Sequence, residues 1–242
     1  MSGILRRRAL IVAAGTHPLT PSDYVQDGLT HMWDGEYNAG TTHSDAITSW
    51  KDLIGTADLT LSPDVIIGDK YMGNDSGTGY IARYSSRIGA YTIQFVFKRN
   101  DFNSSVTTFV LSNRLTDTRY SGNFFFNYGN LGYLYFESLG SLTNRRGVPI
   151  PTSDRSIHTI SASWASGTAA ASNGYDNMAY TMVSNLGGSG REGSTVFMVG
   201  NYAIGGNYGL LGNVYCIRLY NRVLTASEII KNQQIDLQRF TS

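Results

Sequence analysis

The feature of this chain that most constrains its fold is a series of short runs in which apolar and polar residues alternate, separated by glycine-rich segments. Alternation with a period of two residues is typical of a strand that turns one face toward a core. The clearest run places four large apolar residues at every second position: Tyr91, Ile93, Phe95 and Phe97. Similar runs cover residues 157–164, 178–183, 195–199 and 214–220. This spacing predicts a sandwich or jelly roll rather than alternating strands and helices.

Two further runs, 124–127 and 133–136, flank a short segment that contains two glycines, which predicts a hairpin. The composition agrees with an all-β fold. The 242 residues include 27 glycines and 16 tyrosines, and only 15% of them are charged, against ~25% in an average soluble domain. Because a helical protein needs Glu and Lys on its surface, this composition disfavours one.

One helix is expected, near the C-terminal end of the sequence. Thr225 and Glu228 have the spacing of a capping box, in which each residue satisfies a backbone N–H of the other. An incomplete apolar stripe follows, made of Ile229, Ile230, Leu237 and Phe240. Because the stripe is incomplete, we expect this helix to end near Gln233.

Charge and cysteine content exclude several classes of protein. A net charge of +1 argues against binding nucleic acid or an anionic membrane by bulk electrostatics. No apolar run approaches the ~18 residues of a membrane-spanning helix. The single cysteine, Cys216, excludes an internal disulfide and a cysteine-based zinc site. Cys216 alternates with Val214, so we expect both on one strand face and the thiol to be buried and inert.

Residues 1–22 lack the alternation and form a basic arm that contains Arg6, Arg7 and Arg8. A basic stretch followed by the apolar run 9–15 fits a secretory signal, but seven apolar residues are at the lower limit for one. A loose terminal tail is the second interpretation. The third, which we favour, is an arm that docks onto another subunit, because arginine makes bidentate contacts with carboxylates. Residues 23–242 would then form one domain behind the arm.

Two segments carry a resemblance to a known family. Residues 27–35, DGLTHMWDG, are followed by Asn38 and by residues 48–55, TSWKDLIG. This opening resembles that of laminin-G-like, concanavalin A-like jelly rolls. Residues 212–229, GNVYCIRLYNRVLTASEI, resemble the C-terminal signature of the same family. The resemblance covers roughly residues 24–240 and implies a sandwich of two antiparallel sheets with a short C-terminal helix. It does not define a function, because this fold hosts lectins, glycanases and structural modules.

The segment Leu5 to Arg8 resembles the start of structural proteins encoded by bacteriophages and prophages of gut bacteria. This likeness implies a non-catalytic virion protein that decorates a capsid or forms part of a tail or fibre. It would be a homo-oligomer, attached to other virion proteins by its arm. The alternatives are a secreted or surface carbohydrate-binding module of a bacterium, or a glycoside hydrolase of the same fold.

Catalytic patterns are not found in the sequence. A glycanase needs two carboxylates that flank the scissile bond, and retaining enzymes of the resembled family carry them as Glu-x-Asp-x-x-Glu, which does not occur here. The runs 91–97 and 214–220 contain no acidic residue. No Gly-x-Ser-x-Gly nucleophile elbow is present. We therefore expect neither enzymatic activity nor a cofactor.

Two groups of polar residues are candidate metal ligands. The densest group has side chains that suit zinc or manganese, but a polar loop after the first strand is the stronger interpretation. This group consists of His31, Asp34, Glu36, His43 and Asp45. The second group offers the hard oxygen ligands that calcium prefers, or else an ordinary Asx-rich turn; it consists of Asp69, Asn74 and Asp75.

Segments 173–177 and 201–208 combine Tyr, Asn and Gly, which suits glycan recognition, because sugar C–H faces stack on aromatic rings. Contacts between subunits are an alternative role for such tyrosines. The candidate residues are Tyr175, Tyr202, Tyr208, Asn173, Asn201 and Asn207. Host-surface or mucin glycans would be their ligands. The three tryptophans, Trp33, Trp50 and Trp164, are expected to be structural instead.

Overall fold

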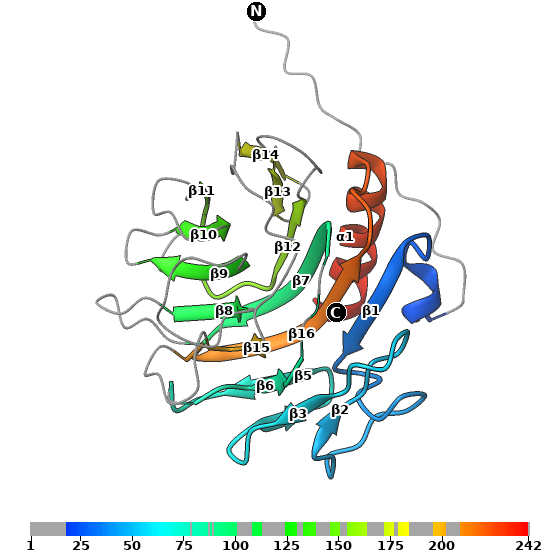
Figure 1. Cartoon of the computed structure of the whole chain (residues 1–242), viewed down its shortest axis with the longest axis vertical. Coiled ribbons are helices and arrows are strands. Elements are labelled where there is room, and N and C mark those ends of the chain that lie inside the picture. The colour runs from blue at the N-terminus through cyan, green and yellow to red at the C-terminus, as the bar shows by residue number, and fades with distance from the viewer. Residues whose placement is uncertain are drawn as a thin grey trace, which may run out of the picture.

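The computed structural model describes residues 18–77, 79–86, 88, 90–100, 108–112, 124–129, 133–138, 146–150, 154–163, 172–176, 179–183, 196–201 and 209–241. In these ranges two antiparallel sheets pack face to face, and helix α1 (Ala226–Phe240) lies against the outer face of one of them (Figure 1). The all-β sandwich predicted from the sequence is therefore confirmed.

Sheet A has the strand order β14-β13-β12-β7-β16-β5-β4, and β1 also pairs with β16. Its strands are β1 (Leu29–Asp34), β4 (Ile66–Gly68), β5 (Tyr71–Asn74), β7 (Thr92–Arg99), β12 (His158–Ser163), β13 (Ser172–Asp176), β14 (Ala179–Val183) and β16 (Gly212–Tyr220). Sheet B has the order β11-β10-β9-β8-β15-β6-β3-β2. Its strands are β2 (Ser49–Trp50), β3 (Leu59–Leu61), β6 (Ala82–Tyr84), β8 (Thr108–Ser112), β9 (Phe124–Gly129), β10 (Tyr133–Ser138), β11 (Arg146–Pro149) and β15 (Phe197–Val199). The expected hairpin is the antiparallel pair β9–β10, and a short 3₁₀ helix, η1 (Pro21–Asp23), precedes β1.

Two apolar clusters lie on opposite faces of sheet A. The cluster between the sheets, called the inter-sheet core below, includes Trp33, Trp50, Leu59, Ile93, Phe95, Phe97, Leu111, Ile160, Phe197, Val199, Val214, Ile217 and Leu219. The cluster under α1, called the helix-side layer, consists of Tyr24, Val25, Leu29, Met32, Val96, Tyr215, Cys216, Tyr220, Leu224, Ile229, Ile235 and Phe240. The molecule thus has three layers, with sheet A in the middle.

Strand β7 shows how the sequence pattern produces these layers. Ile93, Phe95 and Phe97 point into the inter-sheet core, as the alternation predicted. Val96, at an intervening position, belongs to the helix-side layer. The strand is buried on both faces because it is central to its sheet and covered by α1 on the outside.

Strand β16 departs from the simple alternation at a β-bulge between Val214 and Cys216. Val214 lies in the inter-sheet core, whereas Cys216 lies in the helix-side layer. The prediction that these two residues share a face is wrong, because the extra residue Tyr215 reverses the alternation. The Cys216 thiol is fully buried, and burial raises its pKa, which agrees with the expected inert thiol.

Helix α1 begins as predicted, with the Thr225–Glu228 capping box at its first turn. It continues to Phe240, so the prediction that it ends near Gln233 is wrong. Its buried face carries polar side chains, among them Asp236 and Arg239. These side chains have partners on sheet A and on the loop that follows β1, so they extend the buried stripe instead of interrupting it.

The packed body includes part of the segment that the sequence assigned to the arm. Leu19 packs against the helix-side layer, and Thr20 and Asp23 form a capping box around η1. Arg6, Arg7 and Arg8 lie outside the described residues, so their docking role stays a prediction.

Candidate binding site

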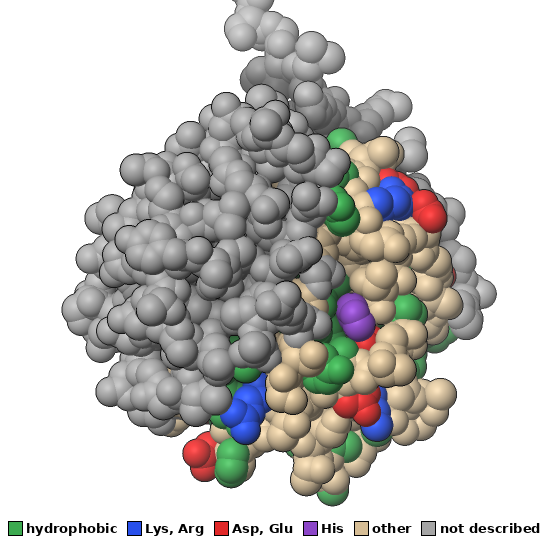
Figure 2. All heavy atoms as spheres, viewed as in Figure 1, with side chains coloured by type: hydrophobic (Ala, Val, Ile, Leu, Met, Phe, Trp, Pro, Cys, Tyr) green, Lys and Arg blue, Asp and Glu red, His purple; other side chains and the backbone are tan. Residues whose placement is uncertain are grey.

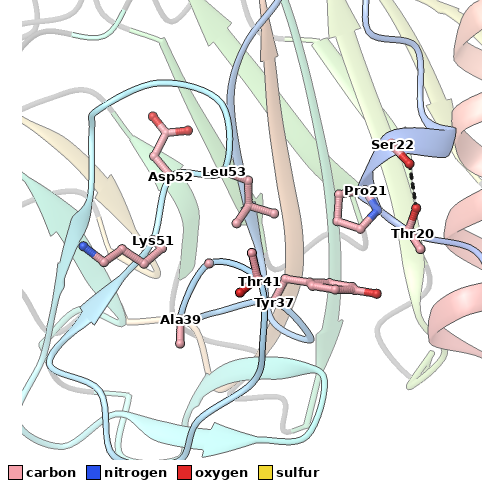
Figure 3. Close-up of a pocket in the computed structure, with 10 residues that line it drawn as sticks. Thr20, Pro21, Ser22, Tyr37, Ala39, Thr41, Lys51, Asp52 and Leu53 are labelled. Carbon is pink, nitrogen blue, oxygen red and sulfur yellow. Dashed lines mark hydrogen bonds between the residues drawn. The ribbon is translucent and has the colours of Figure 1, made fainter.

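An open hollow of about 480 Å³ lies where three segments of the chain meet. It is lined by residues 20–22 of η1 and its cap, by residues 37 and 39–41 after β1, and by residues 51–53 after β2. Figure 3 shows the side chains of Tyr37, Pro21 and Leu53 around this space, whereas the carboxylate of Asp52 points away from them.

The loop that carries Tyr37 is closed by the side chain of Asn38, which is fully buried. Its Oδ1 accepts the backbone N–H of Ser44 at 2.8 Å, and its Nδ2 donates to the carbonyl of Ser44 at 2.9 Å. The carbonyl of Asn38 also accepts the backbone N–H of Lys51 at 3.0 Å, which joins two walls of the hollow. Gly40 has a φ of +107°, in the region that favours glycine. These bonds fix the loop before any ligand arrives.

Asp52 organises the next wall. Its side chain is fully buried, and it accepts hydrogen bonds from His31 Nδ1 at 2.6 Å and from the backbone N–H groups of Met32, Gly55 and Ala57 at 3.0–3.1 Å. Burial alone would raise the pKa of this carboxyl, but these donors outweigh burial, and the pKa is lowered. Asp52 is therefore an ionised structural group, and its carboxylate holds the loop in place by accepting these hydrogen bonds.

Three kinds of group remain available to a ligand in the hollow. Tyr37 offers an aromatic ring, and Pro21 and Leu53 offer apolar surface. The hydroxyl group of Thr41 can donate and accept hydrogen bonds. The hydroxyl groups of Thr20 and Ser22 already bond each other at 2.8 Å, and that of Thr20 donates to Asp23, so these two can accept but not donate. Lys51, at the edge, is half exposed and pairs with Asp58 at 2.5 Å.

The first group of predicted metal ligands is divided among other partners. His31 binds Asp52, and Asp34 and Glu36 both bind Arg239. The remaining two, His43 and Asp45, bind each other at 2.9 Å. In the part of the chain that the structure describes, no group of three or more His, Cys, Asp or Glu residues could hold a metal ion.

The calcium candidates lie at the end of β5 and in the adjoining turns. Asn74 is buried, and its Oδ1 accepts both the backbone N–H and the hydroxyl of Ser76, each at 2.8 Å. Asp69 and Asp75 are exposed. This is the arrangement of an Asx turn, and calcium binding at these residues stays a prediction.

The glycan candidates lie in three different settings. Asn173 and Tyr175 are on strand β13, paired with β14 on one side and with β12 on the other, rather than in the expected loop. Asn201 is fully buried and donates to the carbonyl of Gly79, so it is not available to a ligand at the surface. Tyr202, Asn207 and Tyr208 lie outside the described residues.

No sequence pattern had predicted the hollow. The signal was present, because Tyr37 and Asn38 precede Gly40 and repeat the combination of Tyr, Asn and Gly used to select the later segments. What no pattern revealed is that residues 20–22 and 51–53 meet this loop in space.

Charged side chains do not gather into one patch on the visible face of the described residues. Figure 2 shows acidic and basic side chains scattered there, with no broad basic patch. Among the described residues no helix is long and apolar enough to cross a membrane.

Comparison with known proteins supports the fold. Neither a family model nor a curated protein matches the sequence. Among solved structures, a mutant of Trypanosoma rangeli sialidase that displays trans-sialidase activity has a TM-score of 0.62 at 14% identity, and the match covers 88% of this chain and 33% of that one. The same sialidase in complex with sialic acid has a TM-score of 0.57 at 14% identity, with the same coverage. The chain spans about a third of the length of these sialidase chains.

A smaller protein matches over nearly its whole length. The Ruminococcus gnavus IT-sialidase CBM40 bound to α2,6-sialyllactose has a TM-score of 0.51 at 17% identity, over 66% of this chain and 95% of that chain. At such identities the likeness establishes the fold: this chain is a jelly-roll sandwich of the kind found in sialidases and in their CBM40 domain.

The prediction of a non-enzymatic protein is wrong by this comparison. The solved structures that share the fold include sialidases, and one of them is described as a covalent intermediate with difluorosialic acid. That prediction rested on three missing patterns: the Glu-x-Asp-x-x-Glu triplet, an acidic residue in the runs 91–97 and 214–220, and a Gly-x-Ser-x-Gly elbow. Enzymes that share the fold need not carry these patterns, so their absence does not exclude catalysis.

Proposed function

We propose that this chain is a carbohydrate-binding jelly-roll domain, and that the hollow beside Tyr37 receives a sugar residue of a glycan. The observation that carries the proposal is the hollow itself. Its volume of about 480 Å³ lies within the ~300–1,000 Å³ of sites for small ligands. Its walls are fixed by hydrogen bonds of Asn38 and Asp52, so little ordering would oppose binding.

The lining suits a sugar because it combines an aromatic ring with hydroxyl groups. The C–H face of a pyranose can stack on the ring of Tyr37, while its hydroxyl groups exchange hydrogen bonds with Thr41 and donate to Ser22, whose own hydroxyl hydrogen bonds Thr20. Such a shallow contact predicts modest affinity per site, in the ~mM to μM range, with strength supplied by many copies.

The likeness to the CBM40 domain supports the same class of ligand. That domain is described as bound to α2,6- and to α2,3-sialyllactose. Sialylated glycans are therefore the first to test, with host-surface and mucin glycans as the wider set.

A glycan array with the protein displayed multivalently tests the proposal, followed by titration of the best ligand. Tyr37→Ala should weaken binding about fivefold or more, since a stacked aromatic ring contributes about 1 kcal/mol or more. Tyr80→Ala is the matched control, because this ring also lies under a guanidinium, that of Arg83 at 5.2 Å, but it does not line the hollow. Absence of binding to any glycan would refute the function.

The array also distinguishes the two placements of the site. If the combined change of Tyr175, Tyr202 and Tyr208 to Ala abolishes binding while Tyr37→Ala does not, recognition occurs in the segments selected from the sequence. The opposite result assigns it to the hollow.

Location and assembly are proposed on the sequence resemblance alone. The start of the chain at Leu5 to Arg8 supports a virion protein that docks through Arg6, Arg7 and Arg8 and forms a homo-oligomer. A secreted or surface bacterial module is the alternative that the CBM40 likeness favours. Native mass measurement of the assembly, with the N-terminal residue identified, separates the two.

A further inference from the structure

Helix α1 reaches Tyr37, a lining residue of the hollow, through one side chain that no sequence pattern had selected. Arg239 lies in the last turn of α1 and is almost fully buried. Its Nη1 donates to Asp34 Oδ2 at 2.7 Å, and its Nη2 donates to Asp34 Oδ1 at 3.0 Å and to Glu36 Oε2 at 2.7 Å. Its guanidinium also lies over the ring of Tyr37, 5.6 Å from the centroid.

One guanidinium therefore holds three residues of a four-residue stretch, Asp34, Glu36 and Tyr37, at the start of the loop that forms the hollow. The planar fork of arginine allows this, because it makes bidentate bonds with a carboxylate while its positive charge is attracted to a ring within about 6 Å. A lysine at the same position would supply a single ammonium group and could not make all of these contacts.

Arg239 is itself held in place. Its Nη1 donates to the hydroxyl of Tyr24 at 3.2 Å, and its backbone carbonyl accepts a hydrogen bond from Lys70 Nζ at 2.7 Å. The guanidinium also lies 4.8 Å from the ring centroid of Phe240. The position of the Tyr37 ring thus depends on how the end of α1 is seated.

We propose that Arg239 is a positioning residue for glycan recognition, which fixes the Tyr37 ring in the orientation that receives the sugar and so makes the end of α1 part of the binding site. This inference rests on the proposed function of the hollow. It adds that Arg239, which is far from Tyr37 in the sequence, raises the affinity for the glycan by fixing the Tyr37 ring.

The test compares two variants of α1 by glycan affinity and by stability. Arg239→Lys keeps the positive charge opposite the buried Asp34 but loses the fork and the contact of the guanidinium with the Tyr37 ring. It should weaken glycan binding by up to about fivefold, the loss expected when the stacked ring itself is removed. Ile229→Ala is the matched control: it truncates another buried side chain of α1, ten residues away, or about 15 Å along the helix. It should lower the melting temperature and leave the affinity unchanged.

A double-mutant cycle separates positioning from general destabilisation. If Arg239 acts through Tyr37, then Arg239→Lys should have no further effect on affinity in a Tyr37→Leu background, with weak binding followed by NMR titration into the mM range. Equal losses in both backgrounds, or a loss of affinity in Ile229→Ala equal to that in Arg239→Lys, would overturn the inference. If the unmodified protein binds no glycan, the proposed function fails; if it binds and Arg239→Lys binds equally well, only the inference fails.

Discussion

Trp50 is a side chain whose removal should strongly destabilise the fold. It is fully buried in the inter-sheet core, and its indole N–H donates to the carbonyl of Asp34 at 2.9 Å. We expect Trp50→Ala to lower the free energy of unfolding by about 3–5 kcal/mol, from the lost burial and the cavity left behind. Urea unfolding measures this, with Ile54→Ala as the exposed control. An unchanged unfolding midpoint for Trp50→Ala would contradict the structural role.

Arg218 and Asp236 form a buried ion pair with two hydrogen bonds of 2.6 Å between β16 and α1. Removing one partner leaves the other charge buried, so Asp236→Leu should destabilise the protein by about 3–5 kcal/mol. Replacing both, as Arg218→Met with Asp236→Leu, should recover much of that loss, because an apolar pair needs no compensation. Unfolding of the two single variants and the double variant checks this, and additive losses would count against the pair.

At the scale of one element, the first turn of α1 should make stability depend on pH. The hydrogen bonds from Arg222 and then those from Thr225 lower the pKa of Glu228 from 4.5 to about 2, against the opposing effect of burial. A carboxyl with a depressed pKa stabilises the folded state above its ordinary pKa of 4.5, and this contribution is lost as the pH falls toward 2. Glu228→Gln should flatten the decline in melting temperature between pH 4.5 and 2, while Ser227→Ala, at an exposed neighbouring position, should keep it.

The same helix shows what the sequence could and could not predict. The capping box located the start of α1 because it depends on residues three apart. The predicted end of the helix was wrong because Asp236 and Arg239 are polar and interrupt the apolar pattern in the sequence. They are buried in the structure because they pair with Arg218 and Asp34, which no local pattern reveals. Strand β16 is a second example: the alternating pattern predicted the strand, but it did not predict the bulge at Tyr215. Local periods were predictable, whereas pairings between distant residues were not.

The candidate site depends even more on such distant pairings. Tyr37 is recognisable as a tyrosine in an Asn- and Gly-containing loop, but Pro21 and Leu53 join it only because β1 brings the three segments together. Asn201 shows the opposite error: the sequence selected it as a binding residue, but it is buried. It has the same local composition as a binding loop, yet its side chain binds the carbonyl of Gly79.

Across the whole molecule, segments from both ends of the sequence lie side by side on the outer face of sheet A (Figure 1). The hydroxyl of Tyr24 donates to Asp236 of α1 at 2.8 Å, and the backbone N–H of Val25 donates to Asn232 of α1 at 2.9 Å. The ring of Tyr24 also lies 4.1 Å from the Arg218 guanidinium. Residues 24 and 25 are therefore part of the folded body, although they adjoin the segment assigned to the arm.

Two truncations test where that body begins. Removing residues 1–17 should leave the melting temperature unchanged, because Tyr24 and Val25 keep their bonds to α1. Removing residues 1–25 should lower it by on the order of 10 °C, since the loss of one buried aromatic ring costs about 3–5 kcal/mol and 1 kcal/mol corresponds to about 2–4 °C at this size. Thermal unfolding followed by circular dichroism measures both, with Tyr24→Ala in the full chain as the matched control.

Native mass measurement of the shorter truncation tests the arm, whose removal should abolish the oligomer while the domain stays folded. A folded domain that still forms the oligomer would rule out docking through Arg6, Arg7 and Arg8.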